Sequence, residues 1–203
     1  MVREFIYYSK SAPTTGNFGD DLKKAGRLDV ALNAFLQAFF VSNDARKDTV
    51  LHLVFDGPPD APKHLRLEPF LSNEITLSKK DLLWVIRKLL YKYKKGETVE
   101  LSKGYTVEQK DLLTLVDELK TSGKQVYVLD EKGDDIREIE MHGDEVFVIG
   151  DHEGFEKGLK KILLRKCYAL SVGDPQYLAS QVITLIHNEL DRDLGFNSIK
   201  LKK

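Results

Sequence analysis

Strand-like and helix-like hydrophobic patterns alternate along almost the whole chain, and this alternation constrains the fold more than any other feature. Five stretches are rich in branched and aromatic residues, as buried strands are: residues 3–9, 49–55, 125–129, 145–149 and 166–172. Helical periodicity runs through five more: 27–41, 79–94, 106–121, 155–164 and 176–191. Alternation of this kind favours an α/β fold, in which helices flank both faces of a mostly parallel sheet.

Shorter signals complete the predicted element order. Residues 64–67 are expected to form a short strand, and residues 134–139 a short helix or turn. Ser78 is a candidate N-cap for the helix at 79–94, and Gly123 has the position of a glycine that ends the preceding helix. The basic tail from Asn197 to Lys203 is expected to be frayed.

Length and composition exclude several classes of protein. The 203 residues, 42% hydrophobic and 31% charged, suit one globular domain spanning 1–203. A net charge of −1 means that nucleic acid could be bound only through local basic patches. A single cysteine excludes a disulfide framework within the chain, and we expect no metal site. With neither a signal-peptide core nor an apolar run near the ~20 residues of a membrane span, we expect a cytoplasmic protein with no membrane partner.

Three glycine-containing or polar loops follow predicted strands in the last 80 residues: 129–131, 150–154 and 171–175. Because ligands of open α/β sheets bind beyond the carboxyl ends of strands, these loops are the candidate ligand site. The chain lacks G-x-x-x-x-G-K-[ST], and Gly150, Gly154 and Gly158 do not have G-x-G-x-x-G spacing. From spacing alone, the glycines could equally serve only to make tight turns.

Motifs from both halves carry a resemblance to a known family. Phe147-Val148-Ile149-Gly150-Asp151-His152-Glu153-Gly154-Phe155, Ser171-Val172-Gly173 and Tyr177-Leu178-Ala179-Ser180-Gln181-Val182-Ile183 resemble the SPOUT class of methyltransferases. Tyr8-Ser9-Lys10, Thr14 to Phe18, Gly26-Arg27-Leu28-Asp29 and Phe55-Asp56-Gly57-Pro58-Pro59 are similar to the archaeal tRNA (pseudouridine-54 N1) methyltransferases. The likeness extends from Arg3 to Asp191.

The resemblance implies a C-terminal trefoil knot at about residues 120–195 that binds S-adenosyl-L-methionine (SAM), and an N-terminal half that faces the substrate. It places the cofactor against mostly backbone groups of seven residues: Leu129, Gly150, Ser171, Val172, Gly173, Leu178 and Val182. The chain departs from the family pattern at Val182, where the resemblance implies a cysteine. Any cofactor contact there is therefore expected to come from the backbone.

The resemblance also implies a reaction, methylation of N1 of pseudouridine at position 54 of tRNA. Asp29 is the candidate acceptor for the N1 proton, and Arg27 would orient the base or a phosphate. Without the resemblance, this pair reads as an acid at a helix N-terminus beside a solvated arginine. Five further residues are candidate tRNA contacts, although Asp56 could belong to a simple turn: Lys10, Phe18, Lys23, Lys24 and Asp56.

Alternatives to this function remain open from the residues alone. The substrate could be pseudouridine in rRNA or another RNA uridine, and the chain could be an RNA-binding module without activity or a flavodoxin-like nucleotide-binding protein. A second basic segment, from Arg87 to Lys95, is more simply a solvated helix face. The apolar last helix is core, and in the family it would also form a homodimer interface, so we expect a homodimer.

Overall fold

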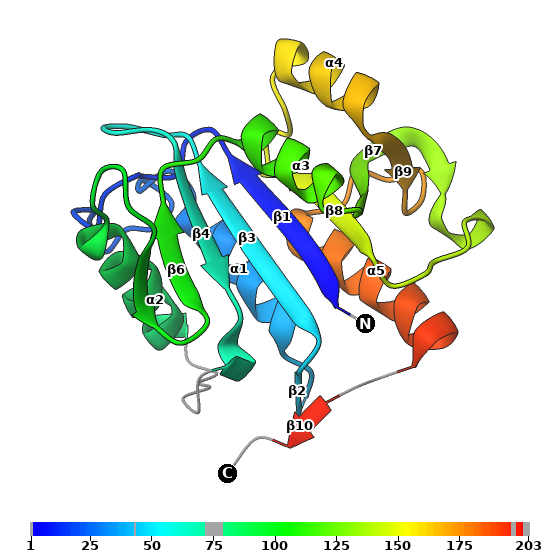
Figure 1. Cartoon of the computed structure of the whole chain (residues 1–203), viewed down its shortest axis with the longest axis horizontal. Helices are drawn as coiled ribbons and strands as arrows, with labels where there is room; N and C mark the ends of the chain where they lie inside the picture. Colours follow the sequence, from blue (N-terminus) through cyan, green and yellow to red (C-terminus); the bar gives the residue numbers. More distant parts are fainter. Residues whose placement is uncertain (1, 43, 72–78, 196–197, 201–203) are drawn as a thin grey trace.

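The computed structural model describes residues 2–42, 44–71, 79–195 and 198–200. Within these residues the centre is a sheet in the order β5-β6-β4-β3-β1-β8-β7-β9 (Figure 1). Strands β3, β1, β8, β7 and β9 are parallel, whereas β4, β6 and β5 join antiparallel. The bounds are β1 Arg3–Ser9, β3 Thr49–Phe55, β4 Lys63–Leu67, β5 Val99–Ser102, β6 Tyr105–Glu108, β7 Gln125–Asp135, β8 Glu145–Gly150 and β9 Tyr168–Ser171. The predicted α/β class is confirmed.

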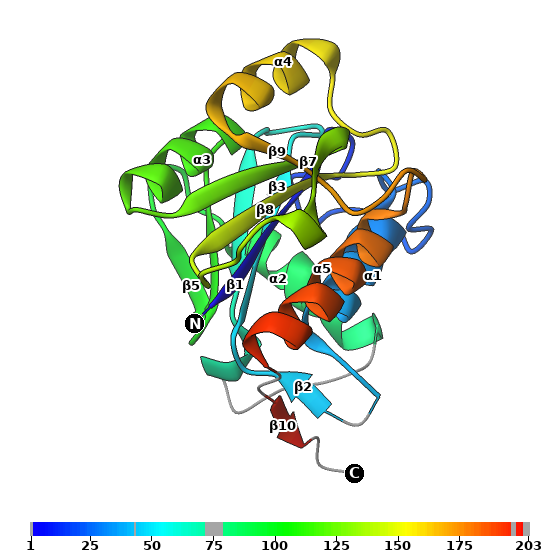
Figure 2. The same ribbon diagram turned by 90° about the vertical axis from the view of Figure 1, so that its right-hand side faces the viewer.

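Helices cover both faces of this sheet (Figures 1 and 2). On one face lie α1 (Leu28–Phe39), α2 (Lys79–Lys92) and α5 (Ala179–Leu194), and on the other lie α3 (Leu112–Thr121) and α4 (Lys157–Lys166). Alternate residues of β1 supply the two cores: Phe5 and Tyr7 belong to the first, Ile6 and Tyr8 to the second. A strand buried on both faces explains the nearly continuous apolar runs of the sequence.

The helix predicted for 106–121 is wrong in its first part. Tyr105–Glu108 is strand β6, which forms a hairpin with β5, and only Leu112–Thr121 is helical. Tyr105 and Val107 are buried while Thr106 and Glu108 are more exposed, which is the two-residue period of a strand. The turn needs Gly104, whose φ is +88° and whose Cβ would lie 2.3 Å from the Glu68 carbonyl oxygen.

The C-terminal tail also differs from the prediction. Ser198–Lys200 forms β10, which pairs antiparallel with β2 (Asp44–Arg46) instead of fraying. Strand β7 is longer than predicted because it pairs with β9 twice, first at Tyr127–Leu129 and again at Asp134–Asp135. The short helix η2 (Ile136–Glu138) follows β7 directly, and η1 (Pro69–Leu71) precedes α2. The proposed cap Ser78 lies outside the described residues, and the knot stays a prediction because strand pairing does not define how the chain threads.

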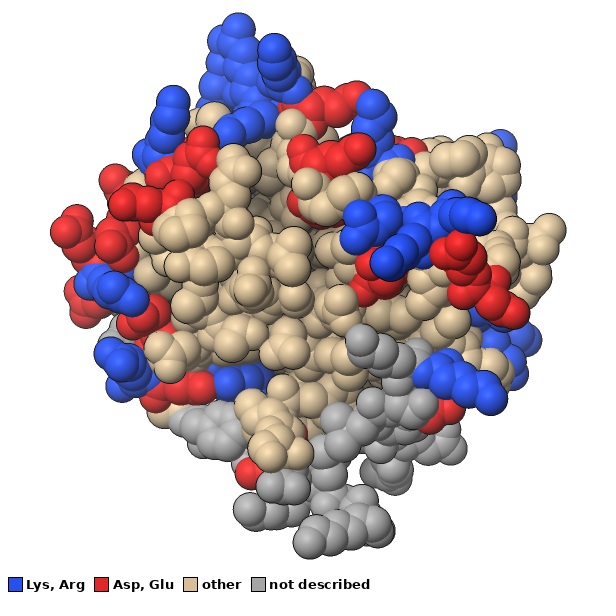
Figure 3. Space-filling view, turned by 180° about the vertical axis from the view of Figure 1, so that it is seen from behind, with Lys and Arg blue, Asp and Glu red and all other residues tan. Residues whose placement is uncertain are grey.

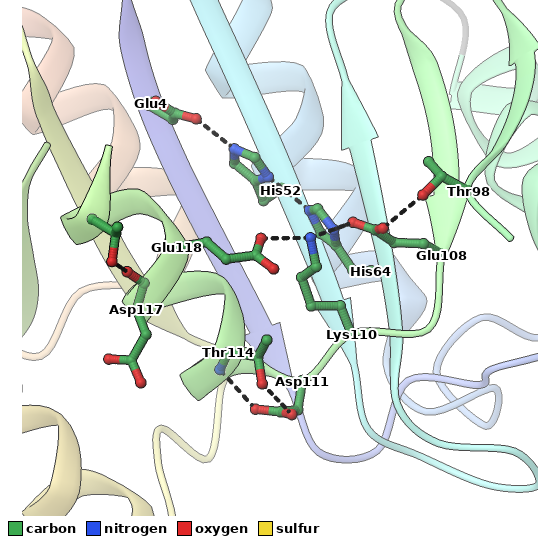
Figure 4. Close-up of polar contacts among 11 residues, drawn as sticks. Glu4, His52, His64, Thr98, Glu108, Lys110, Asp111, Thr114, Asp117 and Glu118 are labelled. Atoms are coloured by element: carbon green, nitrogen blue, oxygen red, sulfur yellow. Dashed lines mark hydrogen bonds and ion pairs between the residues drawn. The ribbon is translucent and has the colours of Figure 1, made fainter. Parts of the chain in front are cut away.

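A buried polar chain crosses four strands on the face that carries α3 (Figure 4). His52 contacts Glu4 and His64, each at 2.7 Å, and His64 contacts Glu108 at 2.9 Å. Burial lowers the pKa of His64 to about 4, and the hydrogen bond from His64 lowers the pKa of Glu108 to about 2. These groups join β1, β3, β4 and β6 through side chains as well as through the backbone.

We expect the stability of the fold to decrease as the pH falls below neutrality. In the unfolded chain a histidine has a pKa of 6.5 and a glutamate 4.5, so His64 and Glu108 both bind protons more weakly in the folded state. The free energy of unfolding therefore falls first between pH 6.5 and about 4 and then from 4.5 towards about 2. Chemical denaturation at pH 7 and pH 5 measures the first loss.

The matched variants for this measurement are His64→Gln and His142→Gln, since His142 is exposed. We expect His64→Gln to be less stable at pH 7 and to lose less on going to pH 5. His142→Gln should follow the wild type. If all three proteins lost the same free energy between the two pH values, His64 would not be a source of the pH dependence.

Candidate active site

A cavity of about 400 Å³ opens beyond the carboxyl ends of β8 and β9, beside the middle of β7, where its pairing with β9 is interrupted after Leu129. The predicted loops 129–131, 150–154 and 171–175 all contribute to its wall, together with the N-terminus of α5. Each of the seven predicted cofactor residues lines it: Leu129, Gly150, Ser171, Val172, Gly173, Leu178 and Val182. The structure thus brings together residues that lie more than 50 positions apart, and the volume is that of an ordinary small-molecule site.

Two glycines give the cavity its shape. A Cβ on Gly150 would lie 2.8 Å from the Cα of Gly154, so a side chain would push apart the turn that closes this loop. Gly173 has φ of +129°, which side chains rarely permit, and the Ser171 hydroxyl accepts its N–H at 3.1 Å. Bare backbone therefore faces the cavity from two of its three loops, as a site built on main-chain contacts requires.

The cavity wall carries more negative than positive charge. Four carboxylates and one lysine line it: Asp130, Glu131, Asp151, Glu153 and Lys160. Lys160 pairs with Asp130 at 2.6 Å, which leaves the other three acids to set the local potential. A cavity with this balance attracts a ligand that carries a positive centre, such as the sulfonium of SAM. The shape and the charge of the wall both fit this cofactor.

Asp151 connects the cavity to the end of β1. Its carboxylate is buried and accepts the Ser9 hydroxyl at 2.7 Å and the Glu153 N–H at 2.9 Å. The Ser9 oxygen in turn accepts the Ala12 N–H at 3.2 Å, at the start of the long loop 10–26. The Ser9 hydroxyl therefore holds both the loop 150–154, through Asp151, and the start of the loop 10–26, through Ala12. No sequence pattern indicated this role of Ser9.

We expect Ser9→Ala to destabilise the protein and to weaken SAM binding. The substitution removes the donor to a buried carboxylate, which costs about 1.5–3 kcal/mol. Thermal denaturation and a SAM titration measure the two effects. Ser122→Ala is the control, because the Ser122 hydroxyl is exposed and donates only to the Leu119 carbonyl. An unchanged SAM affinity in Ser9→Ala would show that Asp151 needs no partner from β1 to hold the loop.

Arg27 and Asp29 form an ion pair at the start of α1. Arg27 Nε and Nη2 donate to the two oxygens of Asp29 at 3.0 and 3.1 Å. Arg27 has φ of +58°, and Gly26 packs so tightly that a Cβ there would lie 1.9 Å from the Ser11 carbonyl oxygen. The loop after β1 therefore holds this pair in place, and Arg27 lowers the pKa of Asp29, which keeps it ionised.

Neither residue of this pair lines the cavity, but both interact electrostatically with residues near it. The pKa of buried Tyr7 is raised by burial first and then by the charge of Asp151, with Asp29 adding to the rise and Arg27 opposing it. Asp151 also acts on Arg27. The loop after β1 joins the two predicted sites, because Ser9 contacts Asp151 in the cavity wall and Gly26, next to Arg27, packs on Ser11.

Four of the five predicted tRNA contacts lie in the loop after β1, which also holds Arg27, and the fifth, Asp56, follows β3. Exposed Lys10 forms an ion pair with Glu156, just after the cavity loop. Asp56 accepts the Tyr8 hydroxyl at 3.1 Å, and Lys23 is exposed. Lys24 pairs with Asp21 at 3.6 Å. All four of these side chains are exposed to solvent.

Phe18 has a packing role that the sequence left open. The guanidinium of Arg87 lies over its ring at 4.6 Å from the ring centre and donates to the Phe18 carbonyl at 3.1 Å. One face of the ring is therefore covered, and Phe18 fixes the loop 10–26 against α2. Arg87, the first cation of the basic segment 87–95, is therefore engaged in this packing contact.

The predicted backbone contact from Val182 stays a prediction. Its N–H donates to the Leu178 carbonyl at 3.0 Å within the first turn of α5, and the residue lines the cavity. Valine in place of the expected cysteine keeps this position apolar and similar in size.

The same fold occurs in solved methyltransferase structures. Nep1 from Archaeoglobus fulgidus, crystallised with S-adenosylhomocysteine, superposes with a TM-score of 0.62, covering 95% of this chain and 98% of that one at 15% identity. A structure described for 2-OH methylation of C/U34 on tRNA gives a TM-score of 0.51 at 13% identity. At these identities the likeness shows the fold, that of the SPOUT methyltransferases.

The family model described as "Putative SAM-dependent RNA methyltransferase" matches residues 2–194, so the chain belongs to this family of SAM-dependent RNA methyltransferases. Curated relatives match over nearly their whole length. The tRNA (pseudouridine(54)-N(1))-methyltransferase of Methanopyrus kandleri is 33% identical over 94% of this chain and 93% of its own. That of Methanococcoides burtonii is 30% identical over 97% and 100%.

In the part of the chain that the structure describes, no group of three or more histidine, cysteine or carboxylate side chains is arranged to hold a metal ion. No described helix is long and apolar enough to cross a membrane.

Proposed function

We propose that this protein methylates N1 of pseudouridine at position 54 of tRNA. The observation that carries the proposal is that the loop holding the Arg27–Asp29 pair is tied through Ser9 to Asp151, in the wall of an acidic, glycine-walled cavity. The relatives that share 30–33% of its sequence over nearly full length carry this activity in their names.

The residues of the chain divide the chemistry between two neighbouring places. SAM, when bound in the cavity, supplies the methyl group as an electrophile. Gly150, Ser171 and Gly173 would hold it, and Asp151 positions the Gly150 loop. N1 of pseudouridine is neutral and poorly nucleophilic while it keeps its proton. Asp29, ionised by its contact with Arg27, would accept the N1–H as a hydrogen bond and draw the proton away from the nitrogen.

A pair of tRNA substrates tests the proposal directly. The protein is incubated with methyl-labelled SAM and with tRNA that contains either pseudouridine or uridine at position 54. We expect label in the pseudouridine tRNA alone, at a single nucleotide. Equal label in both tRNAs would move the substrate to uridine, and SAM binding with no transfer to either would indicate a module without activity. Fragments of rRNA that contain pseudouridine provide the third arm.

We further propose that the protein acts as a homodimer through α1 and α5. A second groove of about 390 Å³ lies on these helices, and its lining is uncharged: Gln37, Tyr177, Ser180, Gln181, Thr184 and Leu185. Figure 3 shows a broad surface here without charge, with Lys, Arg, Asp and Glu gathered around its rim. Exposed Tyr177 lines both this groove and the cavity, and its exposed neighbour Leu178 lines the cavity, so a second copy would also enclose the cavity mouth.

Light scattering at micromolar concentration measures the assembly. We expect twice the mass of one chain, and we expect Thr184→Arg to halve it by placing a charge in the uncharged face. Thr121→Arg, on α3 at the opposite face of the sheet, is the control. A monomeric wild-type protein would contradict the proposal. An enzyme that modifies tRNA in this way is expected in the cytoplasm.

A further inference from the structure

The short helix α4 has a charge pattern unlike the rest of the molecule. Its ten residues include five cations and no acid: Lys157, Lys160, Lys161, Arg165 and Lys166. The chain as a whole carries a net charge of −1, so this is a local concentration of positive charge. The prediction of basic patches from sequence considered the loop 10–26 and residues 87–95, and it did not include this helix.

The arrangement is unfavourable for the helix itself. Lys157 occupies the first helical position, where the macrodipole is positive and an acidic residue would be stabilising. Lys157, Lys161 and Arg165 follow at intervals of four residues and therefore repel one another on one face. Nothing within the helix compensates this repulsion, which points to an external anion as the reason for the pattern.

Two of the five cations are occupied by the fold, and three are not. Lys160 pairs with Asp130 at 2.6 Å, and Lys166 pairs with Asp117 at 2.6 Å. The remaining three are exposed and make no ion pair with another described residue: Lys157, Lys161 and Arg165. Glu156, the acid next to this row, is already paired with Lys10.

The row begins at the end of the sheet where the candidate active site lies and continues away from it along α4. Helix α4 follows the cavity loop directly, and Lys160 contributes to the cavity wall. In Figures 1 and 2, α4 lies over β7 and β9, on the side of the sheet away from α1 and α5, and it runs from near the carboxyl end of β8 to the amino end of β9. Figure 3 shows Lys and Arg side chains gathered at this end of the molecule. A long anionic substrate whose target base enters beside the cavity would pass over this helix.

We propose that Lys157, Lys161 and Arg165 bind phosphates of the tRNA substrate outside the target nucleotide. Successive members of the row are separated by about 6 Å along the helix axis, so the row contacts a stretch of backbone and not a single phosphate. Such contacts position the RNA without reading its sequence. The inference rests on the proposed tRNA substrate and names a surface by which the tRNA is held.

The test compares two charge-matched double variants of the full-length protein. Lys157→Gln/Lys161→Gln removes two cations of the row. Lys47→Gln/Lys103→Gln removes two exposed cations from turns at the other end of the strands. Dissociation constants for tRNA are measured by fluorescence anisotropy at several salt concentrations between 50 and 200 mM, with SAM affinity and thermal denaturation alongside.

We expect the α4 variant to bind tRNA about tenfold more weakly, and the slope of log K against log salt to shrink by about 1.5–2. The control should stay within about twofold of the wild type. SAM affinity should not change, and the melting temperature of the α4 variant should be equal or higher because repulsion along the helix is relieved. In turnover, KM for tRNA should rise while kcat at saturating tRNA stays near the wild-type value.

The result separates this inference from the proposed reaction, because binding is measured with tRNA containing either uridine or pseudouridine at position 54. The loss in the α4 variant should be the same with both. If the α4 and control variants bind alike, the inference is overturned even where methylation of pseudouridine is confirmed. If no tRNA is methylated but the α4 variant alone loses tRNA affinity, the surface is confirmed and the proposed reaction fails.

Discussion

Replacing Asp29 with alanine is expected to reduce turnover by about 10²–10⁴-fold, the usual contribution of a positioned acid or base. SAM affinity should stay near the wild-type value, because Asp29 does not line the cavity. Single-turnover methyl transfer and a SAM titration measure the two quantities. Asn in place of Asp29 should also be slow, because the amide keeps the shape but loses the charge that draws the proton.

The ion pair with Arg27 also predicts how activity depends on pH. Because Arg27 lowers the pKa of Asp29, the carboxylate is ionised well below neutrality, and Asp29 should produce no loss of activity between pH 8 and pH 5. Asp21→Ala is the matched control, since Asp21 is exposed in the same loop and pairs only with Lys24. If Asp29→Ala abolished SAM binding instead, its role would lie in the cofactor site.

Replacing Gly150 with valine is expected to weaken SAM binding, which the Asp29 substitution should leave unchanged. Its Cβ would lie 2.8 Å from the Cα and 2.9 Å from the carbonyl carbon of Gly154, both of them backbone atoms. Overpacking of this kind costs about 1–3 kcal/mol, so SAM affinity should fall by about 10–100-fold. The affinity for tRNA, which is held elsewhere, should change little. Isothermal titration with SAM and anisotropy with tRNA give the two values.

The matched control is Gly158→Ala beside Gly150→Ala. A Cβ on Gly158 meets no atom within 4 Å, and alanine within α4 should raise helix stability. Gly150→Ala should bind SAM more weakly than the wild type, and Gly158→Ala should bind it equally well. Equal affinities in Gly150→Ala and the wild type would mean that the turn at Gly154 adapts and that the cavity does not depend on this glycine.

Much of the fold follows from local patterns. The buried strands β1, β3 and β8 fall where branched and aromatic residues run without interruption, because a parallel strand is covered on both faces. The pattern failed at residues 106–108, because four alternating residues next to a longer helical pattern are too few to be recognised as a separate strand. The hairpin is decided by pairing with β4 and by Gly104, which are not visible within the segment itself.

Part of the candidate site was also visible in the local sequence, and part depends on the fold. Glycine and small polar residues after strands marked the three cavity loops, since bare backbone at a strand end is a local property. The charge row of α4 is equally visible in the sequence, but its meaning depends on which cations the fold pairs. Lys160 and Lys166 find partners on β7 and α3, and only that pairing leaves the other three exposed and unpaired among the described residues.

The sequence by itself determined the alternating α/β architecture, the three loops of the cavity and the residue types from which an acidic site for a cation can be made. Only the tertiary structure decided that Ser9 and Asp151, 142 positions apart, share one hydrogen bond. It also decided that the loop holding the Arg27–Asp29 pair is tied to the cavity wall through Ser9. Periodicity and composition are local, whereas a hydrogen bond between distant residues exists only after the sheet has ordered β1 beside β8.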